Sequence, residues 1–169
     1  GELTAGTFLE GAPVIRVDSL SKRGIDEMRT ALEELAARKQ ERAPGPIFRL
    51  PVDRVFSVKG FGTVVTGSAL SGSLSIEDKL ELLPRGDLVR VRGIESQGKQ
   101  EKTASAGMRL AINLPQLSVE DLSRGDVLAT PERLKPTFML DVECRILEAS
   151  PVPLEQRQRV RVHIGTKEV

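Results

Sequence analysis

The stretch from Gly93 to Gln100 has the residue types that come nearest to phosphate chemistry. It reads Gly-Ile-Glu-Ser-Gln-Gly-Lys-Gln, one residue away from the pattern G-x-x-x-x-G-K-S/T that cradles nucleotide phosphates. Its eighth position is Gln100, which has no hydroxyl to bind magnesium. A phosphate-binding loop also needs a helix after it, whereas residues 103–107 lead into a predicted strand. We therefore interpret this stretch as a polar loop of a β structure.

Cys144 and His163 are the only cysteine and the only histidine of the chain. Cys144 occupies the same alternate positions as its apolar neighbours, so we expect a thiol that packs in a core and not a nucleophile. His163 has no cysteine near it and no serine in a nucleophile-elbow sequence, which leaves acyl transfer without support. One cysteine and one histidine also exclude a disulfide framework and a structural zinc site. The sequence therefore predicts no catalytic residue and no metal site.

The composition is that of a globular protein without a dominant charge. The chain has 169 residues, 39% of them hydrophobic and 29% charged, and 25 Lys and Arg stand against 24 Asp and Glu. Because there are five Phe but no Trp or Tyr, a binding surface of stacked aromatic rings is not expected. No apolar run is long enough for a membrane span and no signal-peptide pattern is present. The default expectation is a cytoplasmic protein that does not bind membranes.

Residues 1–43 carry one strand signal and one helix signal. Residues 14–17 are a short β-branched run, and residues 18–21 form a turn sequence. Apolar residues then recur at the spacing of one helix face, at Ile25, Met28, Leu32 and Leu35. Because one strand and one helix cannot bury each other's apolar faces, we expect these residues to be the end of a larger domain.

Residues 44–131 are predicted to form a mainly β domain, which begins after the helix-breaking sequence Ala-Pro-Gly-Pro at residues 43–46. Short β-rich runs alternate with turn residues at a spacing typical of an antiparallel barrel or sandwich. The six candidate strands are Ile47–Asp53, Gly62–Leu70, Lys79–Leu83, Leu88–Ile94, Met108–Asn113 and Val127–Ala129. We predict a closed antiparallel β-barrel of six or more strands, with an interior that includes Val64, Val91, Leu110 and Ile112.

Residues 132–169 follow a second linker and carry two more strand patterns. Apolar residues occupy alternate positions from Phe138 to Ile146 and again from Val160 to Ile164. Because two strands alone make only a marginal sheet, we expect the first strands of a second β-barrel.

The segment from Leu50 to Gly67 closely resembles the first strands of domain II in the translational GTPases, the family of elongation factor Tu. It reads Leu-Pro-Val-Asp-Arg-Val-Phe-Ser-Val-Lys-Gly-Phe-Gly-Thr-Val-Val-Thr-Gly. Residues 107–114 and 123–129 resemble later strands of the same domain. Residues 163–166 resemble a motif early in domain III, and residues 17–32 resemble the last base-contacting loop and helix of the GTPase domain. The resemblance implies a GTPase-domain remnant in 1–43, domain II in 44–131 and the start of domain III in 132–169.

Within this family, residues 51–72, 109–114 and 163–169 look more like the selenocysteine-specific branch than like elongation factor Tu. The resemblance implies a GTP-dependent elongation factor that binds selenocysteinyl-tRNA and delivers it to the ribosome. In such factors a further C-terminal region recognises the selenocysteine insertion element of the messenger. GTP and magnesium are the cofactors of the whole factor. A complete P-loop and the motifs D-x-x-G and N-K-x-D are absent from these residues, so we expect no enzyme activity and no cofactor here.

Domain II in this family holds the aminoacyl end of the tRNA, and the matching positions are Asp53, Phe56, Thr66 and Arg109. Elongation factor Tu has a glutamate where Asp53 stands and a neutral asparagine where Arg109 stands. A selenol is largely ionised at neutral pH, so a guanidinium is a suitable partner for it. Asp53 could accept a hydrogen bond from the α-amino group of the ester. Residue types alone favour the alternative that Asp53 and Arg109 pair with each other and brace the barrel.

Four further arginines lie on predicted strand faces that point outward. They are candidates for contacts to tRNA phosphates, although such residues are usually only solvated: Arg90, Arg92, Arg159 and Arg161.

Two other functions compete with tRNA recognition. One is a related GTPase, such as the regulatory subunit of sulfate adenylyltransferase, which shares the barrel. Arg109 and the motif at residues 163–166 count against it. The other is a stand-alone β-barrel interaction module, against which the two incomplete flanks count.

Overall fold

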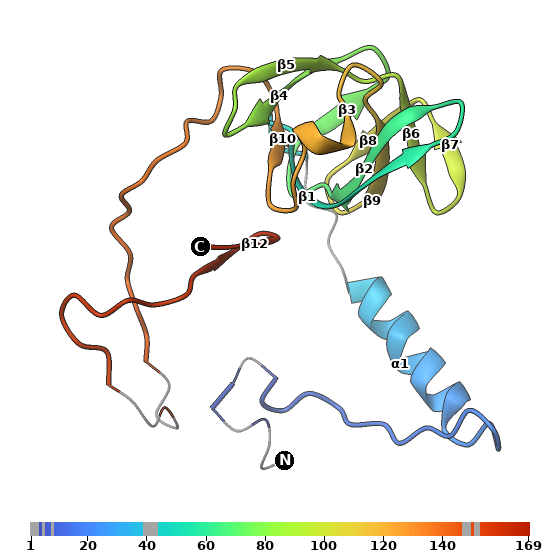
Figure 1. Cartoon of the computed structure of the whole chain (residues 1–169). Coiled ribbons are helices and arrows are strands. Elements are labelled where there is room, and N and C mark those ends of the chain that lie inside the picture. Colours follow the sequence, from blue (N-terminus) through green and yellow to red (C-terminus); the bar gives the residue numbers. More distant parts are fainter. Residues whose placement is uncertain (1–3, 5, 8, 39–43, 147–149, 151–152) are drawn as a thin grey trace. The chain divides into compact units, whose positions relative to one another are not determined.

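The computed structural model describes residue 4, residues 6–7, 9–38 and 44–146, residue 150, and residues 153–169. The chain divides into two compact units, Gly1–Ala43 and Pro44–Val169. Figure 1 shows a helix in the first unit and the strands in the second. Among the described residues, no helix has the length and apolar character needed to cross a membrane.

Helix α1, Ile25–Arg38, is the main element of the first unit. Asp26 and Glu27 lie in its first turn and Arg38 in its last, an arrangement that the helix dipole favours. The preceding turn also forms, because the Asp18 side chain accepts a hydrogen bond from the Leu20 backbone N–H at 3.0 Å. The predicted helix and turn are both confirmed.

The strand expected at residues 14–17 does not form, so this prediction is wrong. A strand needs a neighbour to satisfy its backbone N–H and C=O groups, and the described residues of the first unit contain no other strand. The apolar face of α1 also stays uncovered within this unit: no residue of the helix is buried, and Leu32 and Leu35 are both more than half exposed.

The second unit is built on one sheet of eight strands in the order β5-β4-β10-β1-β2-β9-β6-β7. These strands are β1 (Arg49–Val58), β2 (Gly62–Ser68), β4 (Lys79–Leu83), β5 (Asp87–Arg90), β6 (Gly93–Ser96), β7 (Lys99–Glu101), β9 (Arg109–Asn113) and β10 (Val127–Ala129). A separate pair consists of β3 (Ser73–Ser75) and β8 (Thr103–Ser105), and a short 3₁₀ turn, η2 (Val119–Asp121), precedes β10.

All strand pairings of the sheet are antiparallel. Backbone hydrogen bonds on either side of the β3–β8 pair tie it to the sheet. The Gly107 N–H donates to Ala69 O at 2.8 Å, and the Glu77 N–H donates to Val91 O at 2.8 Å. The result is the mainly β, antiparallel, barrel-like fold that the sequence predicts.

The barrel encloses one apolar core. Its largest fully buried side chains are Phe48, Leu50, Leu74, Leu80, Leu82, Ile94, Leu110, Ile112, Leu114, Leu128, Val52 and Val65. The predicted core positions Val91, Leu110 and Ile112 are confirmed. The prediction that Val64 lies in the core is wrong, because Val64 is only half-buried while its neighbour Val65 is fully buried. In a strand that carries two successive valines, the register selects the inner one, and here Val65 pairs with Ile112.

Most predicted strands form with small differences in their bounds. Two are reproduced residue for residue, at Lys79–Leu83 and Val127–Ala129. The expected strand Leu88–Ile94 is split into β5 and β6, and buried Val91 lies between them. The first strand also runs on to Val58. Residue types did not indicate β3, β7 and β8, because each is a three-residue strand with at most one apolar side chain.

The stretch Gly93–Gln100 that resembles a phosphate loop is a β-hairpin. Strands β6 and β7 pair with each other, and Gln97 and Gly98 connect them with φ of 52° and 75°. Two successive positive φ values are typical of the tight turn that joins hairpin strands. The next element is β8 and not a helix. The interpretation as a polar loop is confirmed only for Gln97 and Gly98, because the rest of the stretch is paired as strand.

The strand pattern of residues 137–146 is not realised. No strand is found there, and Phe138, Val142 and Cys144 are all exposed. The predictions of a half-buried strand and of a thiol in a core are therefore wrong for this structure. Alternating residues form a strand only beside a partner strand, and the described residues give this segment none.

The last predicted strand, at residues 160–164, forms only in part. In its place the structure has a short hairpin, which we call the terminal hairpin. Its strands are β11 (His163–Ile164) and β12 (Lys167–Glu168), and paired hydrogen bonds between Val162 and Val169 extend it.

Asp121 is expected to make the barrel sensitive to acid. Its carboxylate accepts hydrogen bonds from the Ser118 hydroxyl at 2.7 Å and the Ser118 N–H at 2.8 Å, and it pairs with Arg85. These contacts lower the pKa of Asp121 from 3.8 to about 2. Because the pKa is lower in the folded state, the carboxylate stabilises the fold above its unfolded pKa. That contribution is lost as the pH falls through the folded pKa.

Urea unfolding measured between about pH 2 and pH 6 checks this expectation. The unfolding free energy of the native chain should fall more steeply with acid than that of the Asp121→Asn variant. Parallel curves for the two proteins would contradict the role of Asp121.

Candidate nucleic-acid interface

Four residues predicted for the aminoacyl site come from three neighbouring strands. Strand β2 lies between β1 and β9. In an antiparallel sheet, directly paired residues share a face. Phe56 pairs with Val64, and Ser68 pairs with Arg109. Because side chains alternate along a strand, Val64, Thr66 and Ser68 share the face opposite to buried Val65. The register therefore places Phe56, Thr66 and Arg109 on the outer face of the sheet.

Asp53 reaches the same group of residues because β1 bulges at its position. Val52 pairs with Gly67, whereas Arg54 pairs with the next residue, Thr66, so Asp53 is the extra residue between them. A bulge bends the strand and redirects a side chain. Here Val52 is fully buried while Asp53 is only partly buried, with 21% of its side chain exposed.

Asp53, Thr66 and Arg109 form one hydrogen-bonded cluster. The Arg109 guanidinium binds both carboxylate oxygens of Asp53: Nη1 donates to Oδ2 at 2.5 Å and Nη2 donates to Oδ1 at 3.0 Å. The Thr66 hydroxyl donates to Asp53 Oδ1 at 2.7 Å and accepts from Arg109 Nη2 at 3.4 Å. Two parallel N–H···O bonds to one carboxylate fix the guanidinium in orientation as well as in position.

The charges of the pair stabilise each other. The hydrogen bonds from Arg109 and Thr66 hold the pKa of Asp53 below its usual value, against an opposing effect of burial. The bond to Asp53 raises the pKa of Arg109 in turn. Both groups are therefore ionised at neutral pH. The pair anticipated from residue types is present, and 53% of the Arg109 side chain remains exposed beside it.

Phe56 adds an apolar ring to the same face, with 40% of the residue exposed. Asn113 donates to the Phe61 carbonyl at 2.6 Å and to the Thr63 carbonyl at 3.3 Å. These bonds anchor the loop between β1 and β2 against β9.

Of the four arginines proposed for phosphate contacts, only Arg90 lies on a strand, so the predicted strand positions of the other three are wrong. Arg90 and Arg92 share one carboxylate, Glu77, at 3.2 and 2.9 Å. Arg161 lies 3.6 Å from Glu168 in the terminal hairpin, and Arg159 is exposed. Three of the four therefore already have an acidic partner.

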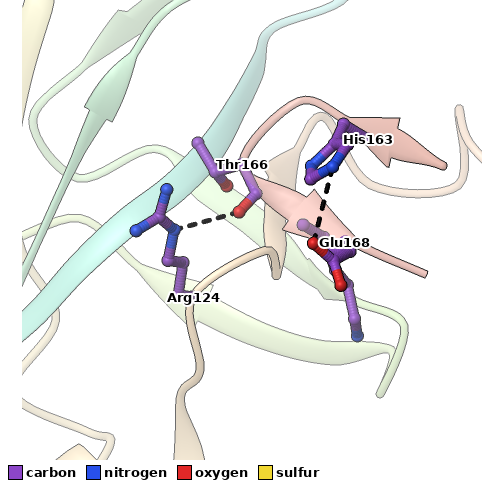
Figure 2. Close-up of a pocket in the computed structure, with 5 residues that line it drawn as sticks. Arg124, His163, Thr166 and Glu168 are labelled. Atoms are coloured by element: carbon purple, nitrogen blue, oxygen red, sulfur yellow. Dashed lines mark hydrogen bonds and ion pairs between the residues drawn. The ribbon is translucent and has the colours of Figure 1, made fainter. Parts of the chain in front are cut away.

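A second polar cluster lies where the terminal hairpin meets the barrel (Figure 2). It lines an open cavity of about 380 Å³ with Arg124, His163, Thr166, Lys167 and Glu168. Arg124 Nε donates to the Thr166 carbonyl at 3.0 Å, and His163 Nε2 lies 3.4 Å from Glu168. The Thr166 hydroxyl donates to the Val52 carbonyl at 2.6 Å. Sequence reasoning gave Arg124 and Thr166 no role, and no residue pattern connects Thr166 with Val52 across 114 positions.

The class of domain follows from the barrel and its match to a known family. Residues 62–129 match the family of elongation factor Tu domain 2. The barrel is thus of the kind found in translation elongation factors.

The whole chain is similar to selenocysteine-specific elongation factors. It is 43% identical over 165 residues to that factor from Desulfomicrobium baculatum, covering 98% of this chain and 26% of the relative. It is 37% identical over 148 residues to the factor from Escherichia coli, covering 87% and 23%. The chain thus spans about a quarter of the length of the curated relatives it matches.

Solved structures agree with the sequence comparison. The crystal structure of a bacterial selenocysteine-specific elongation factor, EF-Sec, superposes with a TM-score of 0.68 at 32% identity, covering 74% of this chain and 22% of that one. The factor from Methanococcus maripaludis in complex with a GTP analogue gives a TM-score of 0.66 at 27% identity, covering 72% and 27%. The chain is therefore similar, in sequence and in fold, to one part of the selenocysteine-specific elongation factors.

Proposed function

We propose that residues 44–131 bind the aminoacyl end of selenocysteinyl-tRNA, as part of a cytoplasmic, GTP-dependent factor that delivers this tRNA to the ribosome. The names of the relatives support the class of tRNA. The cluster of Asp53, Thr66 and Arg109 is the binding site that we propose. Recognition of the selenocysteine insertion element in the messenger is assigned to a region other than these residues.

The observation that carries this proposal is the exposed guanidinium of Arg109. Asp53 holds it from one side through two hydrogen bonds, and yet 53% of the Arg109 side chain faces solvent. A guanidinium has five N–H donors in a rigid plane, so it can hold Asp53 and accept a second anion at its open edge. Asp53 then acts as the brace that orients Arg109 and as an acceptor for the α-amino group of the ester.

Charge is the basis on which this site would select selenocysteine. The selenolate pairs with Arg109, whereas the neutral hydroxyl of serine, the biosynthetic precursor, offers no charge. A site built for a polar partner rejects a ligand that lacks it, because its own polar groups are then left incompletely paired. Phe56 contributes apolar contact next to this pair without distinguishing the two ligands.

The test uses the chain itself and stable amide-linked analogues of 3′-aminoacyl-adenosine. Selenocysteinyl-adenosine at neutral pH should shift the NMR signals of Asp53, Thr66 and Arg109 at lower concentration than seryl-adenosine does. Adenosine alone is the control for contacts with the nucleoside. Shifts that avoid β1, β2 and β9, or equal responses to all three compounds, would refute the proposed site.

Nucleotide binding is not expected from these residues. The Gly93–Gln100 stretch is a hairpin without a following helix, so it does not aim backbone N–H groups at a phosphate. Calorimetric titration of the chain with GTP and magnesium should give no binding heat. Micromolar affinity would contradict this expectation.

A further inference from the structure

The Val52 carbonyl is the point at which the terminal hairpin is joined to the aminoacyl site proposed above. It accepts hydrogen bonds from the Thr166 hydroxyl at 2.6 Å and from the Gly125 N–H at 2.9 Å. The Val52 N–H donates to the Asp126 carbonyl at 2.8 Å. Val52 is thus held at both backbone polar groups, immediately before the bulge residue Asp53.

The hairpin approaches the barrel closely enough to hold this carbonyl. A Cβ placed on Gly125 would lie 2.4 Å from the Lys167 side chain, and one on Gly165 would lie 3.2 Å from Pro51. Arg124 fixes the other polar group at the hairpin tip by donating to the Thr166 carbonyl at 3.0 Å. Figure 2 shows Arg124 and Thr166 facing each other at this junction. Thr166 is therefore bound through its backbone to one barrel loop and through its side chain to β1.

The peptide between Val52 and Asp53 decides where the Asp53 carboxylate points. In a bulge the extra residue has no ladder partner of its own, so its direction depends on how the preceding peptide is held. Inside the ladder, the strands on either side supply that restraint. At the start of this bulge, the restraint comes from Gly125 and Thr166.

We propose that Thr166 is a positioning residue for the Asp53–Arg109 cluster: its hydroxyl holds the Val52 carbonyl and thereby fixes the direction in which the bulge presents the Asp53 carboxylate. The relevance of this role to tRNA rests on the function proposed above. Docking of the hairpin and order in the cluster are then coupled, so each stabilises the other.

Side-chain hydrogen exchange of the Arg109 guanidinium provides the test, measured by NMR on the full chain without any tRNA or ligand. The Thr166→Val variant keeps the shape of the side chain and removes the hydroxyl donor. Its Arg109 protons should exchange about threefold to tenfold faster than in the native chain, because the Asp53 pair opens more often. Thr166→Ser keeps the donor and should restore the native rate.

Two controls separate positioning from general stability. The Arg161→Gln variant removes an ion pair within the same hairpin but no contact to Val52, so Arg109 exchange should stay at the native rate. The backbone N–H of Ile112 reports on the barrel core and should exchange equally slowly in all variants.

Three results would overturn the proposal: an unchanged Arg109 rate in Thr166→Val, equal acceleration in the valine and serine variants, or a parallel acceleration at Ile112. The last two would assign the effect to packing or to overall stability. None of these measurements involves tRNA. They therefore test the positioning role of Thr166 even if the proposed binding of selenocysteinyl-tRNA is disproved.

Discussion

Replacing Gly72 by alanine is expected to cost the barrel about 3 to 5 kcal/mol of unfolding free energy, which is in the range of the most damaging single substitutions. Gly72 has φ of +71°, in the left-handed region. A Cβ there would lie 2.3 Å from the backbone nitrogen of Phe48 and 2.5 Å from the carbonyl carbon of Ile47. Phe48 is buried in the core at the entry to β1. Because the clash is with backbone, the barrel cannot relieve it by rotating a side chain.

Gly98 offers a matched control for this substitution. Its φ is +75°, nearly that of Gly72, but no atom lies within 4 Å of the position that a Cβ would take. Gly98→Ala should therefore cost only the conformational penalty, about 1 to 2 kcal/mol. Urea unfolding of the three proteins measures both effects. Equal losses for the two variants would mean that the Ile47–Phe48 backbone before β1 does not pass Gly72 as closely as described.

The second large effect is expected at Arg109, in a full-length factor that carries these barrel residues. Arg109→Asn should weaken the binding of selenocysteinyl-tRNA by about 1 to 3 kcal/mol more than that of seryl-tRNA. This difference corresponds to a change in selectivity between about fivefold and more than a hundredfold. The asparagine removes the guanidinium that pairs with the selenolate, and it leaves the hydroxyl of serine with much the same surroundings. Dissociation constants for both charged tRNAs, measured over a range of salt concentrations, give the effect.

Arg90→Asn is the control for a simple loss of positive charge. Arg90 lies on β5 and pairs with Glu77. If it contacts a phosphate, its loss should weaken both tRNAs equally and reduce the salt dependence by about one counterion. Equal losses for both tRNAs with Arg109→Asn would identify that residue as a backbone contact as well.

Strands with several alternating apolar residues could be predicted from the sequence, and strands without them could not. Strand β4 is an example of the first kind. Its apolar residues Leu80, Leu82 and Leu83 were sufficient to predict where the strand begins and ends. In contrast, β7 reads Lys-Gln-Glu and contains no apolar residue. It forms because the turn at Gln97 and Gly98 brings it back against β6. Such a strand is specified by its turn and by its neighbour, which are not properties of its own side chains.

The residues of the aminoacyl cluster were predicted from the resemblance to elongation factor Tu. Their arrangement in space could not be predicted, because it depends on the three-dimensional fold. Asp53 and Arg109 are 56 positions apart, and strict alternation from buried Val52 gives no account of the extra residue at Asp53. The register shift between Val52 and Arg54 is a tertiary feature. The contact of Thr166 with Val52 is likewise invisible to periodicity, because it joins a short terminal hairpin to the first strand.

For Cys144, the sequence predicted a buried strand residue that the structure does not contain. Its pattern of apolar alternation is real, but burial depends on what lies beside a segment and not only on the segment itself. In the described structure the thiol is exposed, since residues 137–146 have neither a partner strand nor a core to face. Alternation therefore predicts the potential to form a strand, and the neighbouring elements decide whether the strand forms.

The position of selenium in the bound complex tests directly whether Arg109 recognises selenocysteine. Anomalous X-ray scattering at the selenium edge, from crystals of a full-length factor with these barrel residues bound to selenocysteinyl-tRNA, locates that atom without reference to the protein. We expect a peak over the outer face of β1, β2 and β9, within about 4 Å of the Arg109 guanidinium, which is the distance of an ion pair. A peak remote from Arg109, with the Asp53–Arg109 pair unchanged and the selenium in contact with other residues, would contradict the claim that this cluster recognises selenocysteine.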